Sequence, residues 1–442
     1  MSGAAMHHRD ALHLAHLDTL QQAYAERLEE AGVDALWIYS GAPRLHYGDD
    51  QAPTFRAYGH FVHWAPLPEL SHSWLLIRPG HPPLLQIHAP ADFWHLPAQR
   101  PEAAWCEAFE IRLCDDATPP GCVATRRAVI GDLDAEQAQA MGATLNPPAL
   151  LDALDRGRLH KTPHELACLL DANRAALAGH AAAQHAFEAG AGELDIHLAY
   201  LAASRQRESS LPYASIVGLN QHAGVLHYQH YDPRTPSQRH ALLVDAGHRE
   251  LGYCADITRT WAGPDAPGLF VSLLEAMQSL QRELISACAP GVTFVALHQH
   301  MHHALAAVLI EHGVIRCSAE AAVHDGITRA FCPHGLGHSL GLQVHDVGGK
   351  QDDGGQPLAP PSSDPALRLT RTLTPNMVVT IEPGCYVIPM LLEPLRGGRL
   401  AQQIEWPLVE QLAPCGGIRL EDNIAITDSG QRNLTQLAHG ER

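Results

Sequence analysis

Short apolar runs alternate with stretches of helical periodicity over the first third of the chain. Apolar positions recur with helical spacing over Leu17–Ala31, and Gly32 marks the end of that helix. The apolar runs that follow are Ala35–Tyr39, Ser73–Ile77, Leu84–Ile87 and Ala128–Gly131. Strands that alternate with helices are typical of an α/β domain, so this part of the chain predicts one.

The pattern changes near residue 160, where a long helix rich in alanine and leucine begins. Thr162 suits the N-cap, Pro163 the first helical position and Glu165 the capping position three residues after the cap. Helical patterns cover residues 163–189, 269–288 and 293–312. Strands lie between these helices, so we predict an α/β domain over 1–160 and an α+β domain over 161–442.

Composition and charge exclude several classes of protein. The 442 residues carry 30 Lys and Arg against 48 Asp and Glu, a formal net charge of −18, which disfavours nucleic acid and anionic membranes as partners. A hydrophobic fraction of 46% is typical of a chain that folds throughout. No apolar segment suits a signal peptide or a bilayer span, so we expect a cytoplasmic protein. The ten cysteines include no Cys-x-x-Cys pair and are expected to be reduced, buried thiols.

Two aspartates lie on the two strands of a predicted hairpin. Asp245 ends the apolar strand 241–245, and Asp256 lies in the strand 253–261. If Arg249–Gly252 forms the turn, the two aspartates face each other with Cβ atoms about 4.5–5.5 Å apart. Opposed like charges are destabilising, so this pair suits a shared proton or metal cations, unless both side chains are simply exposed to solvent.

Three histidines follow at intervals of four and seven residues, namely His334, His338 and His345. Glycines at 335, 337 and 341 disfavour a regular helix and favour close approach of the backbone around a site. A cluster of this kind either has a structural role or provides a metal ligand.

Two glutamates lie at the ends of apolar strands further along the chain. Glu382 is the last residue of the strand 377–382, and Arg419 and Glu421 share one face of a strand that begins at Gly417. A carboxylate at the end of a buried strand is costly unless it is paired or bound to a metal.

Four carboxylates and one histidine thus form a candidate metal centre. The carboxylates are Asp245, Asp256, Glu382 and Glu421. Their negative charges balance two divalent cations, so a site with paired metal ions is the simplest interpretation. Oxygen ligands with a single imidazole favour Mn²⁺ or a similar hard ion over a thiolate zinc site, although Co²⁺ or Zn²⁺ also fits.

Five local sequences in a fixed order carry a family resemblance. They are VDAG, CADITRTW, HGLGHSLGLQVHD, TIEPG and IRLEDN. This series resembles the metallopeptidases of the creatinase, or pita-bread, fold, and among them the bacterial Xaa-Pro dipeptidases (prolidases) with the related organophosphorus acid anhydrolases. The resemblance covers nearly the whole chain. It implies a creatinase-like α/β domain over 1–160, a pita-bread catalytic domain over 161–442, and a homodimer.

The resemblance also implies a role for each candidate ligand. Asp245 chelates one metal ion, while Asp256 and Glu421 bridge both ions. His338 and Glu382 complete the second ion.

Other residues that match the family's motifs are implied to act on the substrate or to support the ligands. His227 and His345 lie beside the scissile bond, and Arg371 binds the substrate carboxylate. Arg419 steadies the bridging glutamate, and His334 lies behind the ligands.

The chemistry that such a site supports is hydrolysis by an activated water. Two cations lower the pKa of a shared water from 15.7 toward about 7, and one of them polarises the scissile carbonyl. Glu382 can take the proton from this water and pass it to the leaving nitrogen. The predicted substrate is a dipeptide with C-terminal proline, whose tertiary amide nitrogen has no N–H.

Three alternative functions share these residues or this fold. An Xaa-Pro aminopeptidase would use the same five ligands but needs an open groove for longer peptides. Organophosphorus acid anhydrolase activity would use the same site on tetrahedral phosphorus. A metal-free binding module of the same fold would carry substituted ligands, whereas all five are present in this chain.

Several other histidines and tryptophans are expected to have structural roles. Four histidines lie mid-helix without a carboxylate at matching spacing, so we expect a surface or packing role for His298, His300, His302 and His303. Four tryptophans are expected in the core or at a domain interface, namely Trp37, Trp64, Trp74 and Trp94.

Two loops are expected to lie near the site. Gly348–Pro365 is rich in Gly, Pro, Ser and Asp, which predicts a long mobile loop. Asp49–Phe55 lacks the aromatic residue that the family tends to carry before the proline at this place. In the family this second loop reaches the active site of the partner subunit, so the departure concerns the size of the substrate pocket.

Overall fold

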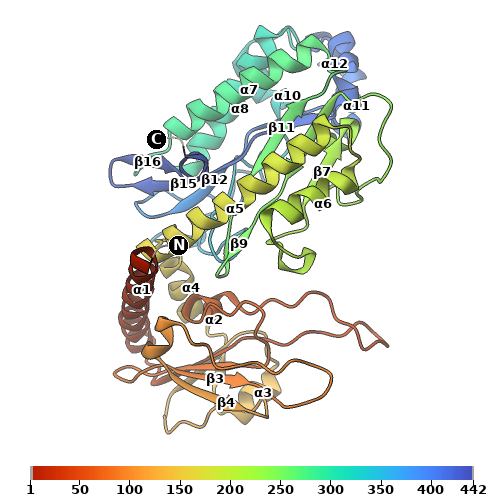
Figure 1. Cartoon of the computed structure of the whole chain (residues 1–442). Coiled ribbons are helices and arrows are strands. Elements are labelled where there is room, and N and C mark those ends of the chain that lie inside the picture. Colours follow the sequence, from red (N-terminus) through yellow and green to blue (C-terminus); the bar gives the residue numbers. More distant parts are fainter. Residues whose placement is uncertain (1–2, 441–442) are drawn as a thin grey trace. The chain divides into compact units, whose positions relative to one another are not determined.

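The computed structural model describes residues 3–440. The chain forms two compact units, Met1–Ala167 and Cys168–Arg442, and each combines helices with strands (Figure 1). The mixed fold class predicted from the sequence is therefore confirmed. The two units divide within helix α5 (Pro163–Glu188), and the domain limits 1–160 and 161–442 stay predictions.

The first unit contains a mixed six-stranded sheet in the order β4-β3-β2-β1-β5-β6. Its strands are β1 (Ala35–Tyr39), β2 (Trp74–Ile77), β3 (Leu84–His88), β4 (Glu110–Cys114), β5 (Arg127–Ile130) and β6 (Thr144–Leu145). The β1–β2 and β2–β3 pairs are antiparallel, and the other pairs are parallel. Each strand predicted in this unit lies within one residue of its predicted limits.

Helices of the first unit surround this sheet, and both faces of the sheet are packed. The helices before α5 are α1 (Gly3–Glu30), α2 (Gly59–Trp64), η1 (Ala104–Ala108), α3 (Ala135–Ala140) and α4 (Pro148–Gly157). Leu36 and Ile38 of β1 pack in one core cluster, while Trp37 and Tyr39 pack in another. Alternate residues of a strand point to opposite faces, so β1 is buried on both sides. Trp94 is 77% exposed, so it does not lie in the core, and its expected place at a domain interface stays a prediction.

Helix α5 begins with the predicted capping box. The backbone N–H of Thr162 donates to Glu165 Oε2 at 2.8 Å, and the backbone N–H of Glu165 donates to Thr162 Oγ1 at 3.4 Å. These reciprocal bonds satisfy backbone donors that a helix start leaves unpaired. Pro163 occupies the first helical position, as predicted.

The second unit continues from α5 with alternating helices and strands. Its first elements are α6 (Glu193–Ser204), η2 (Glu208–Ser210), β7 (Ile216–Leu219), η3 (Asn220–Gly224), β8 (Ala241–Asp245), β9 (Arg249–Glu250), β10 (Tyr253–Cys254), β11 (Thr258–Ala262), α7 (Gly268–Ser286), α8 (Phe294–Glu311), α9 (Ala319–His324) and α10 (Ile327–Phe331). Helices α7 and α8 lie side by side in Figure 1, and both match their predicted ranges closely.

The remaining elements of the second unit follow from Val378 onward and form two of its four small antiparallel sheets. The elements are β12 (Val378–Ile381), β13 (Gly384–Tyr386), α11 (Pro389–Arg396), η4 (Ala401–Gln403), α12 (Trp406–Leu412), η5 (Ala413–Cys415), β14 (Gly417–Arg419), β15 (Asp422–Thr427), β16 (Gly430–Asn433) and α13 (Leu434–His439). The sheet orders are β11-β8-β7, β12-β15-β16, β10-β9 and β13-β14. An isolated bridge between Thr258 and Glu421 links the first of these sheets to the connection between β14 and β15.

The register of the predicted hairpin is wrong by two residues. The turn is the dipeptide Leu251-Gly252, with φ values of 50° and 96°, and Asp245 pairs with Thr258 instead of Asp256. Two consecutive residues with positive φ are typical of a tight hairpin turn, which is shorter than the predicted four-residue turn. A shift of two residues keeps each side chain on its face of a strand, so Asp256 still lies beside Asp245.

The predicted strand that carries Arg419 and Glu421 is interrupted. Strand β14 ends at Arg419 and β15 begins at Asp422, so the two residues do not share one strand face. The interruption allows the backbone N–H of Glu421 to donate to the carbonyl of Thr258 at 3.0 Å. This bond places the glutamate beside the strand after Asp256.

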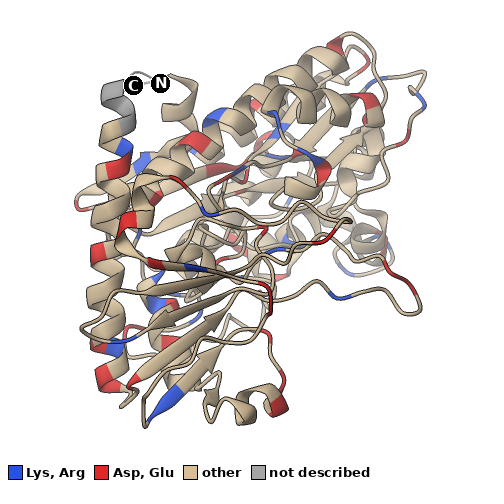
Figure 2. Cartoon of the chain, turned by 60° about the horizontal axis from the view of Figure 1, so that its bottom comes forward, with Lys and Arg blue, Asp and Glu red and all other residues tan. Residues whose placement is uncertain are grey.

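Charged side chains are interspersed over helices and loops of both units. Figure 2 shows blue and red positions mixed along the ribbon. None of the helices in this range is both long enough and apolar enough to cross a membrane.

Candidate metal centre

The five candidate ligands lie at strand ends and in connections of the second unit. Asp245 is the last residue of β8, and Asp256 lies in the short connection between β10 and β11. Glu382 directly follows β12, and Glu421 lies between β14 and β15. His338 lies in the glycine-rich segment after α10. The structure thus brings together residues that are far apart in the sequence.

Glycine allows the segment of His338 to pack directly on β12. A Cβ atom at Gly337 would lie 2.0 Å from the carbonyl oxygen of Thr380, so no larger residue fits there without displacing the backbone. The backbone N–H of His338 donates to Thr380 Oγ1 at 3.1 Å, and the N–H of Thr380 donates to the carbonyl of His338 at 2.9 Å. The close approach predicted from the glycines is confirmed.

The His338 ring faces three of the candidate carboxylates. Its Nε2 lies 3.3 Å from Asp256, 3.7 Å from Glu382 and 4.0 Å from Glu421. Its Nδ1 lies 3.0 Å from the carbonyl oxygen of Ser339, which accepts the ring proton at that atom. In the neutral ring this bond leaves the lone pair on Nε2, on the side of the carboxylates, which is the form of histidines that bind metals.

Tyr213 connects the two aspartates and was missed by the sequence analysis. Its hydroxyl lies 2.7 Å from Asp245 Oδ1 and 2.5 Å from Asp256 Oδ1. The single proton of this hydroxyl can be donated to only one carboxylate at a time. Tyr213 precedes β7 in the sequence, and no local pattern distinguishes it from a core tyrosine.

Arg419 provides the permanent positive charge beside the cluster. Its Nη2 donates to Asp245 Oδ2 at 2.6 Å, and its Nε donates to Thr258 Oγ1 at 3.2 Å. The Thr258 hydroxyl in turn donates to Glu421 Oε2 at 2.8 Å. The guanidinium therefore holds Asp245 directly and reaches Glu421 through Thr258.

His334 lies behind this group, as the resemblance implies. Its Nε2 lies 2.9 Å from the Tyr386 hydroxyl, which accepts a hydrogen bond from Arg419 at 2.9 Å. Its Nδ1 lies 3.7 Å from Glu382. Burial, with smaller contributions from charges that include Arg419 and His227, lowers the pKa of His334 to about 4.

His345 and His227 lie at the exposed side of the cluster. The His345 ring centroid lies 4.5 Å from that of His338 in an edge-on arrangement, and both His345 and His227 are exposed. Exposed imidazoles beside buried ligands are accessible to a substrate.

The side chain of Arg371 is held by the segment 348–353. Its Nη1 donates to the carbonyl of Gln351 at 3.1 Å, and its Nη2 forms an ion pair with Asp353. Arg371 is buried, whereas the side chain of Asp353 is 84% exposed. A buried guanidinium that faces an exposed carboxylate is a site at which another carboxylate can bind.

The four carboxylates are crowded beyond what Arg419 and His338 neutralise. Burial raises the pKa of Glu382 to about 7 and raises that of Glu421 well above its usual value, and neighbouring carboxylates add to both shifts. Burial also raises the pKa of Asp245. Burial opposes ionisation of Asp256 too, but the hydrogen bond and charge of His338 outweigh it and lower the pKa.

This donor set fits divalent cations. Ligand atoms of Asp256, His338 and Glu421 all lie within 4.8 Å of one another, and all three residues are buried. A divalent cation would replace the protons that burial and mutual repulsion otherwise place on these carboxylates. Oxygen atoms outnumber the single imidazole, which favours hard or borderline divalent ions.

A second cluster of histidines and a carboxylate lies on α8. His298 and His302 share a buried helix face, as expected, while His300 and His303 are exposed. The expectation that no carboxylate joins them is wrong, because Asp364 Oδ1 lies 3.2 Å from His298 Nε2 and 3.8 Å from His302 Nε2. Asp364 belongs to the segment Gly348–Pro365, which the sequence spacing could not connect to α8.

The fold and the candidate centre together are those of a metal-dependent hydrolase. The chain belongs to metallopeptidase family M24, which it matches over residues 167–428. Residues 11–155 match the family described as Xaa-Pro dipeptidase, N-terminal domain.

Curated relatives extend over almost the whole chain. An Xaa-Pro dipeptidase from Marinobacter nauticus is 48% identical over 438 residues, which cover 98% of this chain and 99% of the relative. An Xaa-Pro dipeptidase from Aeromonas hydrophila is 42% identical over 434 residues, which cover 96% of this chain and 97% of the relative.

Solved structures of aminopeptidases share the fold. Aminopeptidase P from Escherichia coli in its low-pH form has a TM-score of 0.70 at 21% identity and covers 95% of both chains. Proline aminopeptidase P II from Yersinia pestis has a TM-score of 0.69 at 22% identity and covers 95% of this chain and 96% of its own. The predicted pita-bread fold is therefore confirmed.

Proposed function

We propose that this protein is a metallodipeptidase that hydrolyses dipeptides with C-terminal proline. The observation that carries the proposal is the group of three buried carboxylates, one half-buried carboxylate and one buried imidazole in a chain 48% identical to an Xaa-Pro dipeptidase over 438 residues. The substrate is a small peptide. Two divalent ions, which we propose to be Mn²⁺, would be held by Asp245, Asp256, His338, Glu382 and Glu421. When bound, they supply charge that activates water and polarises the scissile carbonyl.

Glu382 is the proposed proton carrier. It lies at the edge of the group with a side chain 18% exposed, and burial raises its pKa to about 7. A carboxylate in this position accepts a proton from the attacking water and donates it to the proline nitrogen as that nitrogen leaves. The imidazoles of His227 and His345, on the exposed side, hold the peptide at the scissile bond.

Arg371 is the proposed site for the substrate carboxylate. Asp353 already presents a carboxylate to its guanidinium, and the exposed Asp353 side chain can be displaced by the C-terminal carboxylate of proline. This binding orients the peptide and selects dipeptides, because a longer peptide places an amide where the charge belongs.

Association into a homodimer and a cytoplasmic location are also proposed, from the family resemblance and the sequence composition. Size-exclusion chromatography with light scattering measures the first. A single mass equal to one chain would overturn it.

The decisive experiment for the activity compares an Xaa-Pro dipeptide with an Xaa-Pro tripeptide and a phosphotriester on the same purified protein, with metal content measured in parallel. We expect hydrolysis of the dipeptide to exceed that of the tripeptide. Faster tripeptide hydrolysis would assign aminopeptidase activity instead. Hydrolysis of the phosphotriester alone would assign organophosphate hydrolysis.

A further inference from the structure

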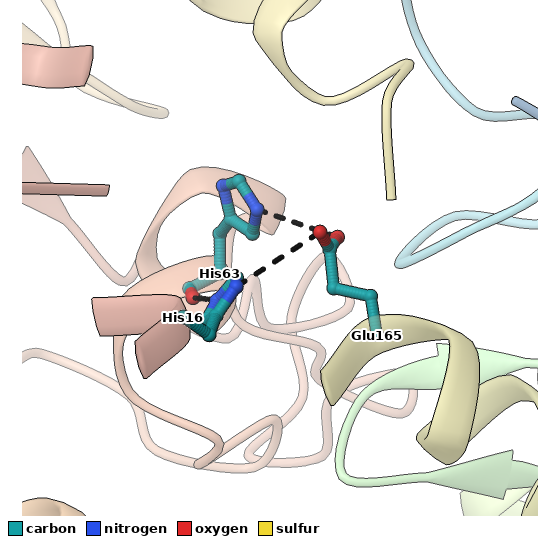
Figure 3. A group of neighbouring side chains, drawn as sticks. All are labelled: His16, His63 and Glu165. Carbon is teal, nitrogen blue, oxygen red and sulfur yellow. Dashed lines mark hydrogen bonds and ion pairs between the residues drawn. The ribbon is translucent and has the colours of Figure 1, made fainter. Parts of the chain in front are cut away.

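The first unit contains a buried group of metal-ligating side chains that the proposed function does not use. His16 lies on α1, His63 on α2 and Glu165 in the first turn of α5, and the three side chains point toward one another (Figure 3). Their exposed fractions are 1%, 5% and 2%. One ligand atom from each lies within 4.8 Å of the others. We name these three residues the His16 cluster.

The His16 ring is oriented by a backbone carbonyl. Its Nε2 lies 3.0 Å from the carbonyl oxygen of His63, which only accepts, so this nitrogen carries a proton. Its Nδ1 therefore presents a lone pair in the neutral ring, and it lies 3.9 Å from Glu165 Oε2 and 2.9 Å from Thr162 Oγ1. Histidines that bind metals usually donate their other ring N–H in this way.

The His63 ring is buried without a hydrogen bond. Neither of its nitrogens has a hydrogen-bond partner among the described residues, although Nε2 lies 3.4 Å from Glu165 Oε1. Leaving a buried polar atom unpaired is unfavourable, so an arrangement that satisfies it is favoured. Two ligands of a tetrahedral zinc ion, each about 2.0–2.1 Å from the metal, lie about 3.3–3.4 Å apart. The separation of Nε2 and Oε1 equals this ligand spacing.

Imidazoles and a nearby ammonium compensate the charge of Glu165, whereas a guanidinium compensates that of the carboxylate beside α8. Asp364 receives two hydrogen bonds from Arg329, at 2.7 and 2.9 Å, whereas Glu165 Oε2 receives its 2.8 Å bond from the neutral backbone of Thr162. Lys161 adds positive charge near Glu165, but its ammonium donates to the carbonyl of Arg158. A cation that approaches Asp364 is therefore repelled by the guanidinium of Arg329. Among the described residues, no guanidinium hydrogen-bonds to Glu165.

We propose that the His16 cluster binds one divalent cation of borderline hardness, with Zn²⁺ as the best match. Its ligands are His16 Nδ1, His63 Nε2 and one oxygen of Glu165, and the Thr162 hydroxyl faces the fourth position. Two imidazoles and one carboxylate suit zinc better than the oxygen-rich centre of the second unit does. The ion joins α1, α2 and the start of α5, so its role is structural.

Anomalous X-ray diffraction at the zinc edge tests this proposal on the unaltered protein. Crystals grown with Zn²⁺ are expected to show an anomalous peak within the His16 cluster in addition to peaks at the centre around Asp256. Peaks at the Asp256 centre alone would overturn the proposal. Because no substitution is made, this result does not depend on the folding of a variant.

Zinc analysis of matched variants provides the second test. His63→Gln removes a proposed ligand, and His60→Gln is the control, since His60 is fully buried but hydrogen-bonds to Tyr24 at 3.0 Å and Asp155 at 2.8 Å. With zinc supplied during expression, we expect three ions per chain in the parent and in His60→Gln, and loss of one ion in His63→Gln. Equal zinc content in all three proteins would overturn the proposal.

A catalytic variant separates this proposal from the proposed function. Asp256→Asn is expected to lose the ions of the second unit but to keep one zinc ion. Chelation of that remaining ion should lower the thermal midpoint of the variant. If the parent binds two ions and Asp256→Asn binds none, the cluster of the first unit is not a metal site, although the proposed function stands.

Discussion

Two clusters of the second unit contain similar residue types but differ in charge. The group around Asp256 combines four carboxylates with one arginine, Arg419, in hydrogen-bond contact. The group on α8 combines two histidines with one carboxylate, Asp364, which Arg329 binds through two hydrogen bonds. If every carboxylate were ionised and every histidine neutral, as metal binding requires, the first group would carry a charge of −3 and the second a charge of 0.

The difference in charge shows that residue types alone do not identify a metal site. Each group contains three buried residues whose ligand atoms lie within 4.8 Å of one another, namely Asp256, His338 and Glu421 in the first and His298, His302 and Asp364 in the second. Burial of uncompensated negative charge is costly, so the first group favours bound cations or protons, whereas a guanidinium already neutralises the second. The number of positive side chains in contact is the feature that separates them.

Removal of metal is expected to have the largest effect. Chelation followed by gel filtration should abolish hydrolysis of an Xaa-Pro dipeptide, and added Mn²⁺ should restore it, because the activated water depends on the ions. The double variant His298→Gln/His302→Gln should keep its metal content and its response to chelation. Activity that survives complete removal of metal, measured by elemental analysis, would contradict the proposal that hydrolysis depends on ions bound by the group around Asp256.

Substitution of the proton carrier is expected to reduce turnover about 10²–10⁴-fold, the usual contribution of a general acid or base. Glu382→Gln keeps an oxygen ligand but loses the titrating group, so kcat should fall while bound metal persists. The measurement is steady-state kinetics with metal analysis of the same sample. Turnover close to that of the parent would assign proton transfer to another residue.

Arg371→Ala is expected to raise KM for an Xaa-Pro dipeptide by about 10- to 100-fold, the equivalent of about 1.5–3 kcal/mol for a charged hydrogen-bonded pair. Hydrolysis of an uncharged phosphotriester should change far less. Asp353→Asn is the matched variant, since it removes the competing carboxylate and should lower KM. Equal losses with both substrates would contradict a role in binding carboxylate.

The smallest expected effect is a loss of folding stability at low pH that arises from His302 in the cluster on α8. Burial, reinforced by the charges of His298 and Arg329, lowers the pKa of His302 to about 3, against 6.5 when exposed. The unfolded chain therefore binds more protons between these values, so the stabilising contribution is complete above pH 6.5 and is lost as pH falls toward 3. The loss for this one group is about 2 kcal/mol at pH 5.

Denaturant unfolding at pH 7 and pH 5 measures this contribution. His302→Gln should lose less stability than the parent on going from pH 7 to pH 5. His300→Gln is the control, because His300 lies on the exposed face of the same helix. Release of metal at low pH is common to all three proteins, so the difference between them isolates His302. An identical pH dependence in the parent and in His302→Gln would contradict the assigned pKa.

The local sequence determined most elements of this protein. Apolar runs predict β1 and its neighbours because a strand buried on both faces needs a continuous run of such residues. Thr162, Pro163 and Glu165 predict the start of α5 because a helix start leaves backbone donors that nearby side chains can satisfy. The candidate metal ligands could also be predicted from the five local sequences. A charged side chain at the end of an apolar strand is unusual unless it has a partner.

Contacts between distant segments could not be predicted from the sequence and became visible only in the tertiary structure. Tyr213 joins Asp245 to Asp256, and Asp364 reaches His298 from more than sixty residues away. The register of the hairpin likewise depended on a two-residue turn with positive φ, for which Leu251 is an unusual residue. Side-chain hydrogen bonds and ion pairs act through space and leave no periodic pattern along the chain. For that reason the sequence predicted the candidate metal ligands, while the structure showed which charged side chains surround them.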